Sequence, residues 1–388
     1  MKFTINRLLM YEAARTVMKI VSKNMQIPEI SGILVEANED SGVVTLTGTD
    51  IRTHIQRRLH SEHIEEGGSA ILTPMLSEML HLLSEETADF ESDGHMMSLR
   101  SGTARYTVPY LEAKAFPKLK IPFPEDTIQI KGINSLIKRT VFAANGNITD
   151  YAKASFSYVK LNFDGGVTRA EATDGSCIAV AYSPHCADGH LEIILHEKAL
   201  CILSSIVKAD EELYAGIVGK YAVFMKENMF FSTLLFTGQY IEASKLIDKI
   251  EPAYGATVDA RRLFEEIDNI ITVFDTGDDK CIDLRIEDGK LHLDTKTAVS
   301  SSTVAIDAID SVPTPPEGFH YYPRLLTDCL RNMNGPVMIR IDARGFILME
   351  TNGCRYFVCP RGPIRIRKDK SEEKKKTKAK TQSKKAAA

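Results

Sequence analysis

A spacing of about 125 residues recurs along this chain and constrains its fold more than any other feature. Two kinds of marker show it most clearly, turn glycines and aromatic residues of late strands: Gly94, Gly219 and Gly345, and Tyr106, Phe231 and Tyr356. The glycines are 125 and 126 residues apart, and the aromatic residues are 125 and 125 apart. A fixed internal period indicates copies of one structural unit, and this length is close to the usual size of a domain. The sequence therefore predicts three copies of one α+β unit.

Each copy is expected to contain two helices and many short antiparallel strands. The first helices are predicted at 7–23, 133–144 and 260–274, and the second ones follow Pro74, Glu197 and Tyr322. Runs such as VVTLTGTD (43–50) alternate apolar and polar residues, which is typical of a sheet with one covered face.

Boundaries between the copies follow from composition. A Pro-rich stretch at 116–126 separates the first two copies, and 239–255 connects the second to the third. We therefore expect repeats at 1–124, 125–248 and 249–366, followed by a tail at 367–388.

The composition predicts a folded body with a charged tail. Of the 388 residues, 44% are hydrophobic, which excludes disorder over most of the length. The first 360 residues carry 36 basic and 49 acidic side chains, a formal charge of −13, whereas 361–388 carry 12 basic and 3 acidic ones. The tail lacks apolar side chains larger than Ala, so we expect it to be disordered and basic. An acidic body can meet DNA only through a locally basic face.

Targeting signals and cysteine motifs are not apparent in the sequence. No stretch approaches the ~18 uninterrupted apolar residues of a membrane span, and charged residues interrupt the N-terminal segment, so we expect a soluble protein that stays where it is made. The seven cysteines are never spaced as CxxC, which predicts reduced, buried thiols and no metal site.

A catalytic role is the weakest of the hypotheses. Asp50 and Asp174 end equivalent strands, and paired carboxylates can hold a metal or act as acid and base. They belong to separate repeats, however, so each is expected to cap a turn. The sequence contains no P-loop, GxSxG, HExxH or GxGxxG motif, and we expect no catalysis.

Several short segments, taken with the threefold repeat, resemble one family. They are MKFTI (1–5), LTGTD (46–50), RSGTARYTVPYLEAKAFPKL (100–119), ATDG (172–175) and TGQY (237–240). The chain resembles the β subunit of bacterial DNA polymerase III, the sliding clamp. The resemblance is strong in the first copy, good in the second and weak in the third, as in a phage-borne or paralogous clamp.

This resemblance implies a head-to-tail homodimer that forms a ring of six domains around double-stranded DNA. Its partners would be the replicative DNA polymerase and the clamp loader, with no cofactor, in the bacterial cytoplasm at the nucleoid. The alternative is a clamp-fold decoy or adaptor that binds clamp partners without encircling DNA. An acidic short helix, MLSEMLHLLSEE (75–86), where the family often has basic residues, favours that alternative.

A ring that holds DNA by topology needs only a weak positive field on its lining helices. Arg15, Lys19 and Lys23 are spaced i, i+4, i+8 and form a basic stripe on the first predicted helix. Ordinary solvated helix faces remain the alternative interpretation. The other candidates for DNA contact are Lys138, Arg139, Lys153, Lys198 and Arg324.

The resemblance also implies a pocket for partner peptides, which the family places between its second and third domains. The family's ATDGHRL reads ATDGSCI here, so Ser176 and Cys177 replace a His and an Arg, and Ile241 replaces a Pro. An altered peptide preference is therefore expected. Carried over position by position, the pocket comprises Thr173, Gly175, Ser176, Cys177, Ile178, Ile241, Lys245, Leu246, Tyr322, Phe357, Val358, Cys359 and Pro360.

The implied dimer seam departs from the family as well. Arg105, Tyr106 and Val108 match the edge strand of the first domain, and the facing residues would be Ile271, Val273 and Phe274. An acidic cluster usually lies nearby, but this chain has TAVSSST (297–303), without a carboxylate. Apolar contact is expected to carry more of this interface than ion pairs.

Overall fold

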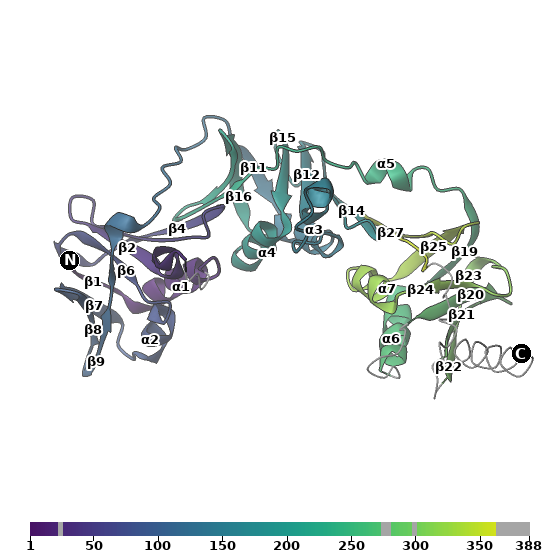
Figure 1. Cartoon of the computed structure of the whole chain (residues 1–388), viewed down its shortest axis with the longest axis horizontal. Coiled ribbons are helices and arrows are strands. Elements are labelled where there is room, and N and C mark those ends of the chain that lie inside the picture. Colours follow the sequence, from purple (N-terminus) through teal and green to yellow (C-terminus); the bar gives the residue numbers. More distant parts are fainter. Residues whose placement is uncertain (22–25, 273–280, 297–300, 362–388) are drawn as a thin grey trace, which may run out of the picture. The chain divides into compact units, whose positions relative to one another are not determined.

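The computed structural model describes residues 1–21, 26–272, 281–296 and 301–361. They form two compact units: unit 1 is Met1–Ile250 with Glu350–Phe357, and unit 2 is Glu251–Met349 with the residues from Val358 onward (Figure 1). Four predicted features lie outside the described residues: Lys23, Val273, Phe274 and the basic tail.

The first repeat runs from the N-terminus through two helices. Its elements are β1 (Lys2–Asn6), α1 (Arg7–Met18), η1 (Pro28–Ser31), β2 (Ile33–Asn38), β3 (Val43–Thr49), β4 (Thr53–His60), β5 (His63–Glu66), β6 (Gly68–Leu72), α2 (Leu76–Leu82), β7 (Thr87–Asp93), β8 (Met96–Ser101), β9 (Ala104–Pro109), β10 (Leu111–Glu112) and η2 (Ala113–Ala115).

The second repeat follows the same order of elements. They are β11 (Ile128–Lys131), α3 (Ile133–Lys138), η3 (Val141–Ala143), η4 (Tyr151–Ser157), β12 (Tyr158–Asp164), β13 (Val167–Thr173), β14 (Cys177–Pro184), β15 (His190–His196), α4 (Glu197–Ile206), β16 (Glu212–Val218), β17 (Tyr221–Lys226), β18 (Met229–Leu234) and α5 (Ser244–Ile247).

The third repeat supplies the rest of the chain. Its elements are β19 (Pro252–Asp259), α6 (Ala260–Ile271), β20 (Ile282–Glu287), β21 (Lys290–Lys296), β22 (Ser301–Asp307), β23 (Ile309–Val312), β24 (Phe319–Tyr321), α7 (Pro323–Leu330), β25 (Pro336–Asp342), β26 (Ile347–Thr351) and β27 (Cys354–Val358).

The sheets of each unit are built from antiparallel neighbours. Unit 1 contains a five-stranded sheet in the order β5-β1-β7-β8-β9 and a nine-stranded sheet in the order β10-β6-β2-β3-β4-β18-β17-β16-β11. It also contains the run β15-β12-β13-β14, and unit 2 contains a four-stranded sheet in the order β22-β21-β20-β24. The nine-stranded sheet joins the first two repeats, because β4 pairs with β18 in antiparallel register.

The repeated α+β architecture is confirmed. Each repeat carries a helix pair, α1 with α2, α3 with α4 and α6 with α7, which Figure 1 shows as three pairs of coils. The three turn glycines join equivalent strands and have φ values of 60°, 57° and 87°, a conformation in which glycine has no Cβ penalty. The third strand aromatic, Tyr356, is fully buried, as is Phe231.

Apolar spacing and side-chain caps explain where the helices begin. Asn6 accepts a hydrogen bond from the Leu9 backbone N–H at 3.1 Å, which caps α1, and Asp259 caps α6 in the same way. Helix α1 buries its apolar face, Met10, Ala13, Ala14 and Val17, against the sheet. The approach is close: a Cβ on Gly48 of β3 would lie 2.6 Å from Val17 Cγ1, so only glycine fits there.

The predicted helices were too long at their C-terminal ends. Helix α1 ends at Met18, α6 ends at Ile271, and α3 ends at Lys138, six residues before the predicted boundary. Just beyond α3, the Thr140 hydroxyl donates to the Leu136 carbonyl at 2.8 Å, and residues 141–143 continue as a 3-10 turn. Such back-bonding by Thr competes with regular helix geometry.

Two equivalent Thr-Asp turns confirm that the paired aspartates are caps. Asp50 Oδ1 accepts from the backbone N–H of Thr53 at 2.7 Å, and Asp174 Oδ1 accepts from that of Cys177 at 2.9 Å. The next residue in each turn has a positive φ, 78° for Ile51 and 90° for Gly175. Glycine adopts this conformation freely, but a β-branched side chain is strained in it.

We therefore expect Ile51→Gly to stabilise the protein, by about 1 kcal/mol, because the strain relieved exceeds the added freedom of the unfolded chain. Urea unfolding followed by circular dichroism measures the change. The matched control is Ile217→Gly, which removes another exposed isoleucine (41%, against 48% for Ile51) from β16 and should destabilise. A loss of stability in both variants would contradict the strain at Ile51.

Candidate functional site

The structure describes two positions of the predicted basic stripe on α1, Arg15 and Lys19. Arg15 is exposed in the last turn of the helix, and Lys19 is its C-cap residue. The Lys19 ammonium donates to the Ser205 carbonyl near the end of α4, at 2.5 Å. Burial, with a smaller contribution from Arg15, lowers the pKa of Lys19. Lys19 therefore links two helices although it is exposed, whereas no such bond to another helix is described for Arg15.

The second-repeat residues predicted to contact DNA also include exposed cations and one that binds backbone. Lys138 and Lys153 are exposed, at the end of α3 and within η4. Arg139 is half-buried, and its guanidinium donates to the carbonyls of Gly353 at 3.2 Å and Ser135 at 3.3 Å. Arg139 thus holds backbone in place, while the two lysines present their charge to solvent.

Helix α4 begins at a histidine that must be neutral. His196 Nδ1 accepts from the Lys198 backbone N–H at 3.2 Å and so caps the helix. Burial first, then the charges of Arg52 and Lys198, lowers the pKa of His196 to about 4. Arg52 is an exposed cation of the Asp50 turn. The sequence did not indicate that it lies near His196, because the two residues belong to different repeats.

In unit 2, Arg324 is the residue predicted to contact DNA. Its side chain is 90% exposed in the first turn of α7, and its guanidinium lies 3.7 Å from Asp328 one turn later. An exposed ion pair of this kind contributes little to stability. The charge of Arg324 is therefore available to a passing ligand.

The unit 1 residues predicted for the peptide pocket lie in two places. Thr173, Cys177 and Ile178 are buried at the β13–β14 turn, whereas Gly175 is exposed and Ser176 is half-buried. The Thr173 hydroxyl donates to the Cys177 carbonyl at 2.7 Å, so this turn is internally braced.

Helix α5 supplies the apolar part of the predicted surface. It packs against β14, its Leu246 is 48% exposed, and Ile241, just before the helix, is 39% exposed. The ammonium of Lys245 forms an ion pair with Glu242. Exposed apolar side chains next to a rigid turn are suited to receiving an apolar anchor from a peptide.

In unit 2, Tyr322 is the exposed residue of the predicted set, at 45%. The guanidinium of Arg361 lies over its ring, 5.0 Å from the centroid, and the Arg361 backbone N–H donates to the His320 carbonyl at 2.7 Å. Val358 is fully buried, and Cys359 and Pro360 are half-buried. Phe357, also half-buried, belongs to unit 1.

The residues predicted for the dimer seam lie on an edge strand. Arg105, Tyr106 and Val108 belong to β9, the last strand of the five-stranded sheet. The Arg105 guanidinium donates to the Ser98 hydroxyl at 3.1 Å, so it is braced by its own sheet. Ile271 is the last residue of α6 and is half-buried.

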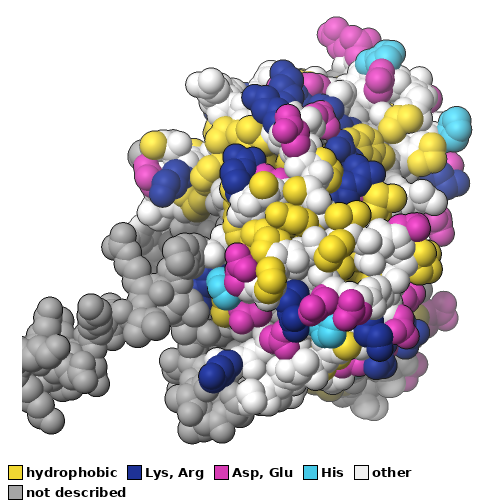
Figure 2. Space-filling model, turned by 90° about the vertical axis from the view of Figure 1, so that its right-hand side faces the viewer, with side chains coloured by type: hydrophobic (Ala, Val, Ile, Leu, Met, Phe, Trp, Pro, Cys, Tyr) yellow, Lys and Arg dark blue, Asp and Glu magenta, His cyan; other side chains and the backbone are white. Residues whose placement is uncertain are grey.

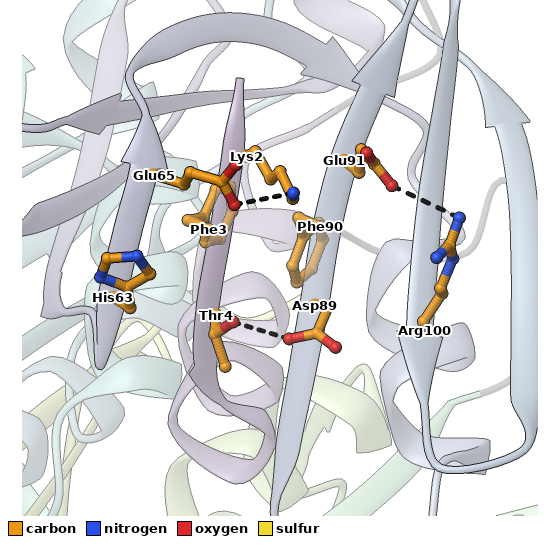
Figure 3. Close-up of a pocket in the computed structure, with 9 residues that line it drawn as sticks. All are labelled: Lys2, Phe3, Thr4, His63, Glu65, Asp89, Phe90, Glu91 and Arg100. Atoms are coloured by element: carbon orange, nitrogen blue, oxygen red, sulfur yellow. Dashed lines mark hydrogen bonds and ion pairs between the residues drawn. The ribbon is translucent and has the colours of Figure 1, made fainter.

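A hollow on the five-stranded sheet is lined by charged side chains that neutralise one another. Figure 3 shows Lys2 paired with Glu65, and Arg100 paired with Glu91 at 3.3 Å. The contact with Glu65 raises the pKa of Lys2. Below them the Phe3 and Phe90 rings stack with centroids 4.7 Å apart. The third carboxylate of the lining, Asp89, accepts from the Thr4 hydroxyl at 2.6 Å, so the hollow offers a ligand little charge beyond that of Asp89.

Unit 2 exposes an apolar groove along β19, β23 and β25. It has a volume of about 270 Å³, and its lining includes Tyr254, Val312 and Met338. Figure 2 looks at the side of the molecule where these strands lie and shows hydrophobic side chains gathered between charged ones. The sequence did not predict this groove. Its exposed residues alternate with buried ones along β19 and β25, so they form no continuous apolar run in the sequence.

Comparisons with known proteins agree on one family. Residues 1–120 match the model of the DNA polymerase III beta subunit, N-terminal domain. The beta sliding clamp of Bacillus subtilis is 24% identical over 360 residues, 89% of this chain and 93% of that protein. A putative DNA polymerase III beta subunit from Eubacterium rectale has a similar fold, with a TM-score of 0.84, 19% identity, and coverage of 93% and 100%.

A second similar structure carries a ligand. The sliding clamp of Pseudomonas aeruginosa, bound to griselimycin, has a TM-score of 0.81 to this chain at 18% identity, with 93% and 99% of the two chains covered.

None of the described helices is both long and apolar enough to cross a membrane.

The cap at His196 predicts a pH dependence. Because its folded pKa of about 4 lies below the unfolded value of about 6.5, its contribution is complete above pH 6.5 and is lost as the pH falls toward 4. We expect His196→Asn, which keeps a capping oxygen, to lose less stability than the wild type between these pH values. Urea midpoints across this range measure it. The control His95→Asn, at an exposed histidine, should keep the wild-type dependence; an equal slope for His196→Asn would contradict the assignment.

Proposed function

This chain is a divergent relative of the DNA polymerase III beta subunits, and we propose that it is a sliding clamp, a processivity factor that encircles duplex DNA and tethers a DNA polymerase. The proposal rests on the family match of residues 1–120 and on relatives that cover the described repeats. One structural observation supports it further: β9 and β22 stand at the edges of their sheets, whereas equivalent strands of other repeats are paired.

Equivalent strands of different repeats have different neighbours. In the second repeat the last strand, β18, pairs with β4 of the first repeat, with Phe231 opposite Ile55. Its equivalent in the first repeat, β9, stands at the edge of its sheet. The equivalent of β4 in the third repeat, β22, also stands at the edge of its sheet. Among the described strands, β9 and β22 therefore each lack the neighbour that their equivalents have.

A second copy of the chain, placed head to tail, would supply both missing neighbours. Strand β9 of one copy would pair with β22 of the other, and the same contact would form a second time, which closes a dimer into a ring. Exposed strand edges invite such pairing. The alternation of half-buried and exposed residues in both strands suits an edge that becomes covered on assembly.

The charge distribution suits a protein that slides. We propose six exposed cations for DNA contact, five on or next to helices and Arg52 in the Asp50 turn: Arg15, Arg52, Lys138, Lys153, Lys198 and Arg324. Phosphate contacts of this kind carry no sequence information and weaken with salt. Lys19 and Arg139 are not in this set, because their donors hold backbone carbonyls.

We propose that polymerase and clamp loader bind through short peptides. In unit 1 the peptide-binding surface would comprise the β13–β14 turn with Ile241 and Leu246. Tyr322 is a separate candidate contact on unit 2. The family's accessory role assigns no reaction to this chain, so we propose that it is not a catalyst. Because a clamp works where duplex DNA is replicated, we propose that it acts in the bacterial cytoplasm, at the nucleoid.

The edge-strand account is tested by Tyr106→Asp, which puts a charge into β9. We expect the dimer to dissociate at least about tenfold more readily, because a desolvated charge would face the partner strand. Analytical ultracentrifugation measures this, and primer extension with the cognate polymerase and loader should give shorter products. The control is Tyr214→Asp, at an exposed tyrosine of β16. A dimer unchanged by Tyr106→Asp would rule out β9 as the seam.

The partner surface is tested by Leu246→Ala and Tyr322→Ala. Each removes an exposed apolar group, and we expect each to weaken binding of a polymerase-derived clamp-binding peptide about tenfold. Fluorescence anisotropy with a labelled peptide measures the affinity. Leu82→Ala, at the still more exposed Leu82 of α2, is the control. If both variants bind as the wild type and the control do, the surface is wrongly placed.

A further inference from the structure

Three side chains of unit 2 with metal-binding atoms lie together in the described part of the chain. They are Cys281, Asp283 and His320, and one ligand atom from each lies within 4.8 Å of the other two. The sequence did not indicate this group, because Cys281 and His320 are separated by 38 other residues and match no short zinc motif.

Strand pairing explains why these residues meet. Strands β20 and β24 are antiparallel neighbours, and Asp283 stands directly opposite His320. Cys281 precedes Asp283 by two residues, so its side chain returns to the same side of the chain. His320 Nδ1 and Asp283 Oδ1 form a hydrogen bond, which fixes the imidazole beside the carboxylate. The Thr295 hydroxyl donates to the Cys281 carbonyl at 3.3 Å and holds the backbone at the third ligand.

The three donor atoms differ in kind, and their combination selects among metals. A thiolate, an imidazole nitrogen and a carboxylate oxygen together suit zinc, whereas magnesium and calcium prefer oxygen donors alone. Zinc with three protein ligands keeps its fourth position for water. We propose that Cys281, Asp283 and His320 bind Zn²⁺ in this way, independently of the clamp function.

Access and charge favour a cation at this place. The side chains of His320 and Asp283 are 37% and 41% exposed, while Cys281 is buried, so an ion can enter from solvent and meet the thiol at the inner end. On the neighbouring strand, Asp294 stands opposite Asp283. Arg285, two residues after Asp283 on β20, is paired with Asp294 at 3.7 Å and with Glu287. Its charge is therefore balanced by its own neighbours.

A plain His–Asp pair is the simpler interpretation, and the chain contains an example for comparison. His190 Nδ1 lies 3.0 Å from Asp164 Oδ1, with both side chains exposed. Within the described residues, the pair at His320 has a thiol beside it, that of Cys281, whereas the pair at His190 belongs to no such group of metal-binding side chains. The two pairs therefore differ in the ligand that gives zinc its affinity, which makes His190 a matched control.

Binding would have a structural consequence within unit 2. The ion would join the residue before β20 to β24, and the residue after β24 is Tyr322, which begins α7. Zinc requires the deprotonated thiol and the neutral imidazole. On binding, the ion replaces the hydrogen bond between His320 and Asp283, the imidazole keeps its proton on the ring nitrogen that does not bind zinc, and the thiol proton goes to solvent, so binding weakens as the pH falls. Amide hydrogen exchange of β20 and β24 should slow when the ion binds, because two strands are then tied together.

The test is titration of the reduced, metal-free full chain with Co²⁺, followed by Zn²⁺. We expect a thiolate-to-cobalt charge-transfer band that reaches one equivalent and is removed by Zn²⁺. Cys281→Ser should abolish the band, and His320→Gln should weaken binding at least about tenfold, since even outer partners of a metal site contribute that much. His190→Gln and Cys201→Ser, at an exposed cysteine of α4, should behave as the wild type does.

Three results would overturn the proposal: no charge-transfer band in the wild type, a band that persists in Cys281→Ser, or equal loss in the control variants. Circular dichroism establishes that each variant is folded. Should Cys281→Ser fail to fold, His320→Gln and Asp283→Asn decide the question, because both change half-exposed side chains. Zn²⁺ affinity within twofold of the wild type in both of these variants would then exclude the site.

Discussion

Main-chain pairing between repeats is the constraint on which the rest of this structure depends. The bonds between β18 and β4 turn two separate repeats into one nine-stranded sheet. The same pairing explains why the late-strand aromatic of the second repeat is buried while that of the first, Tyr106, is only half-buried. When repeats of one chain join edge to edge, the two terminal edges, here β9 and β22, stay unpaired, and a second copy of the chain can pair with both.

The helices and the sheets have separate tasks in this arrangement. The helices carry exposed cations, and some cations that look equivalent in the sequence are already committed to backbone carbonyls. Lys19 holds Ser205, and Arg139 holds Gly353. Exposed cations such as Arg15 and Lys138 can contact phosphates without reading bases, which suits a ring that must move along DNA rather than bind one sequence.

Sequence patterns predicted the parts of this structure that depend on neighbouring residues. The turn glycines, the helix pairs and the caps at Asp50 and Asp174 were all predicted, because each follows from local conformation. The roles of Lys19 and Arg139 were not, since their acceptors lie 186 and 214 residues away in the chain. The early end of α3 was missed because the Thr140 side chain bonds back into the helix, which spacing alone does not reveal. Cys281 and His320 meet only through strand pairing.

Topological retention on DNA tests the central claim most directly. The protein is loaded by its cognate loader onto a nicked circular duplex, the salt is raised, and the DNA is then cut once with a restriction enzyme. A closed ring holds on by linkage, so the protein should remain on the circle at high salt and leave after the single cut. Release from the intact circle at the same salt concentration, or retention after the cut, would contradict a ring.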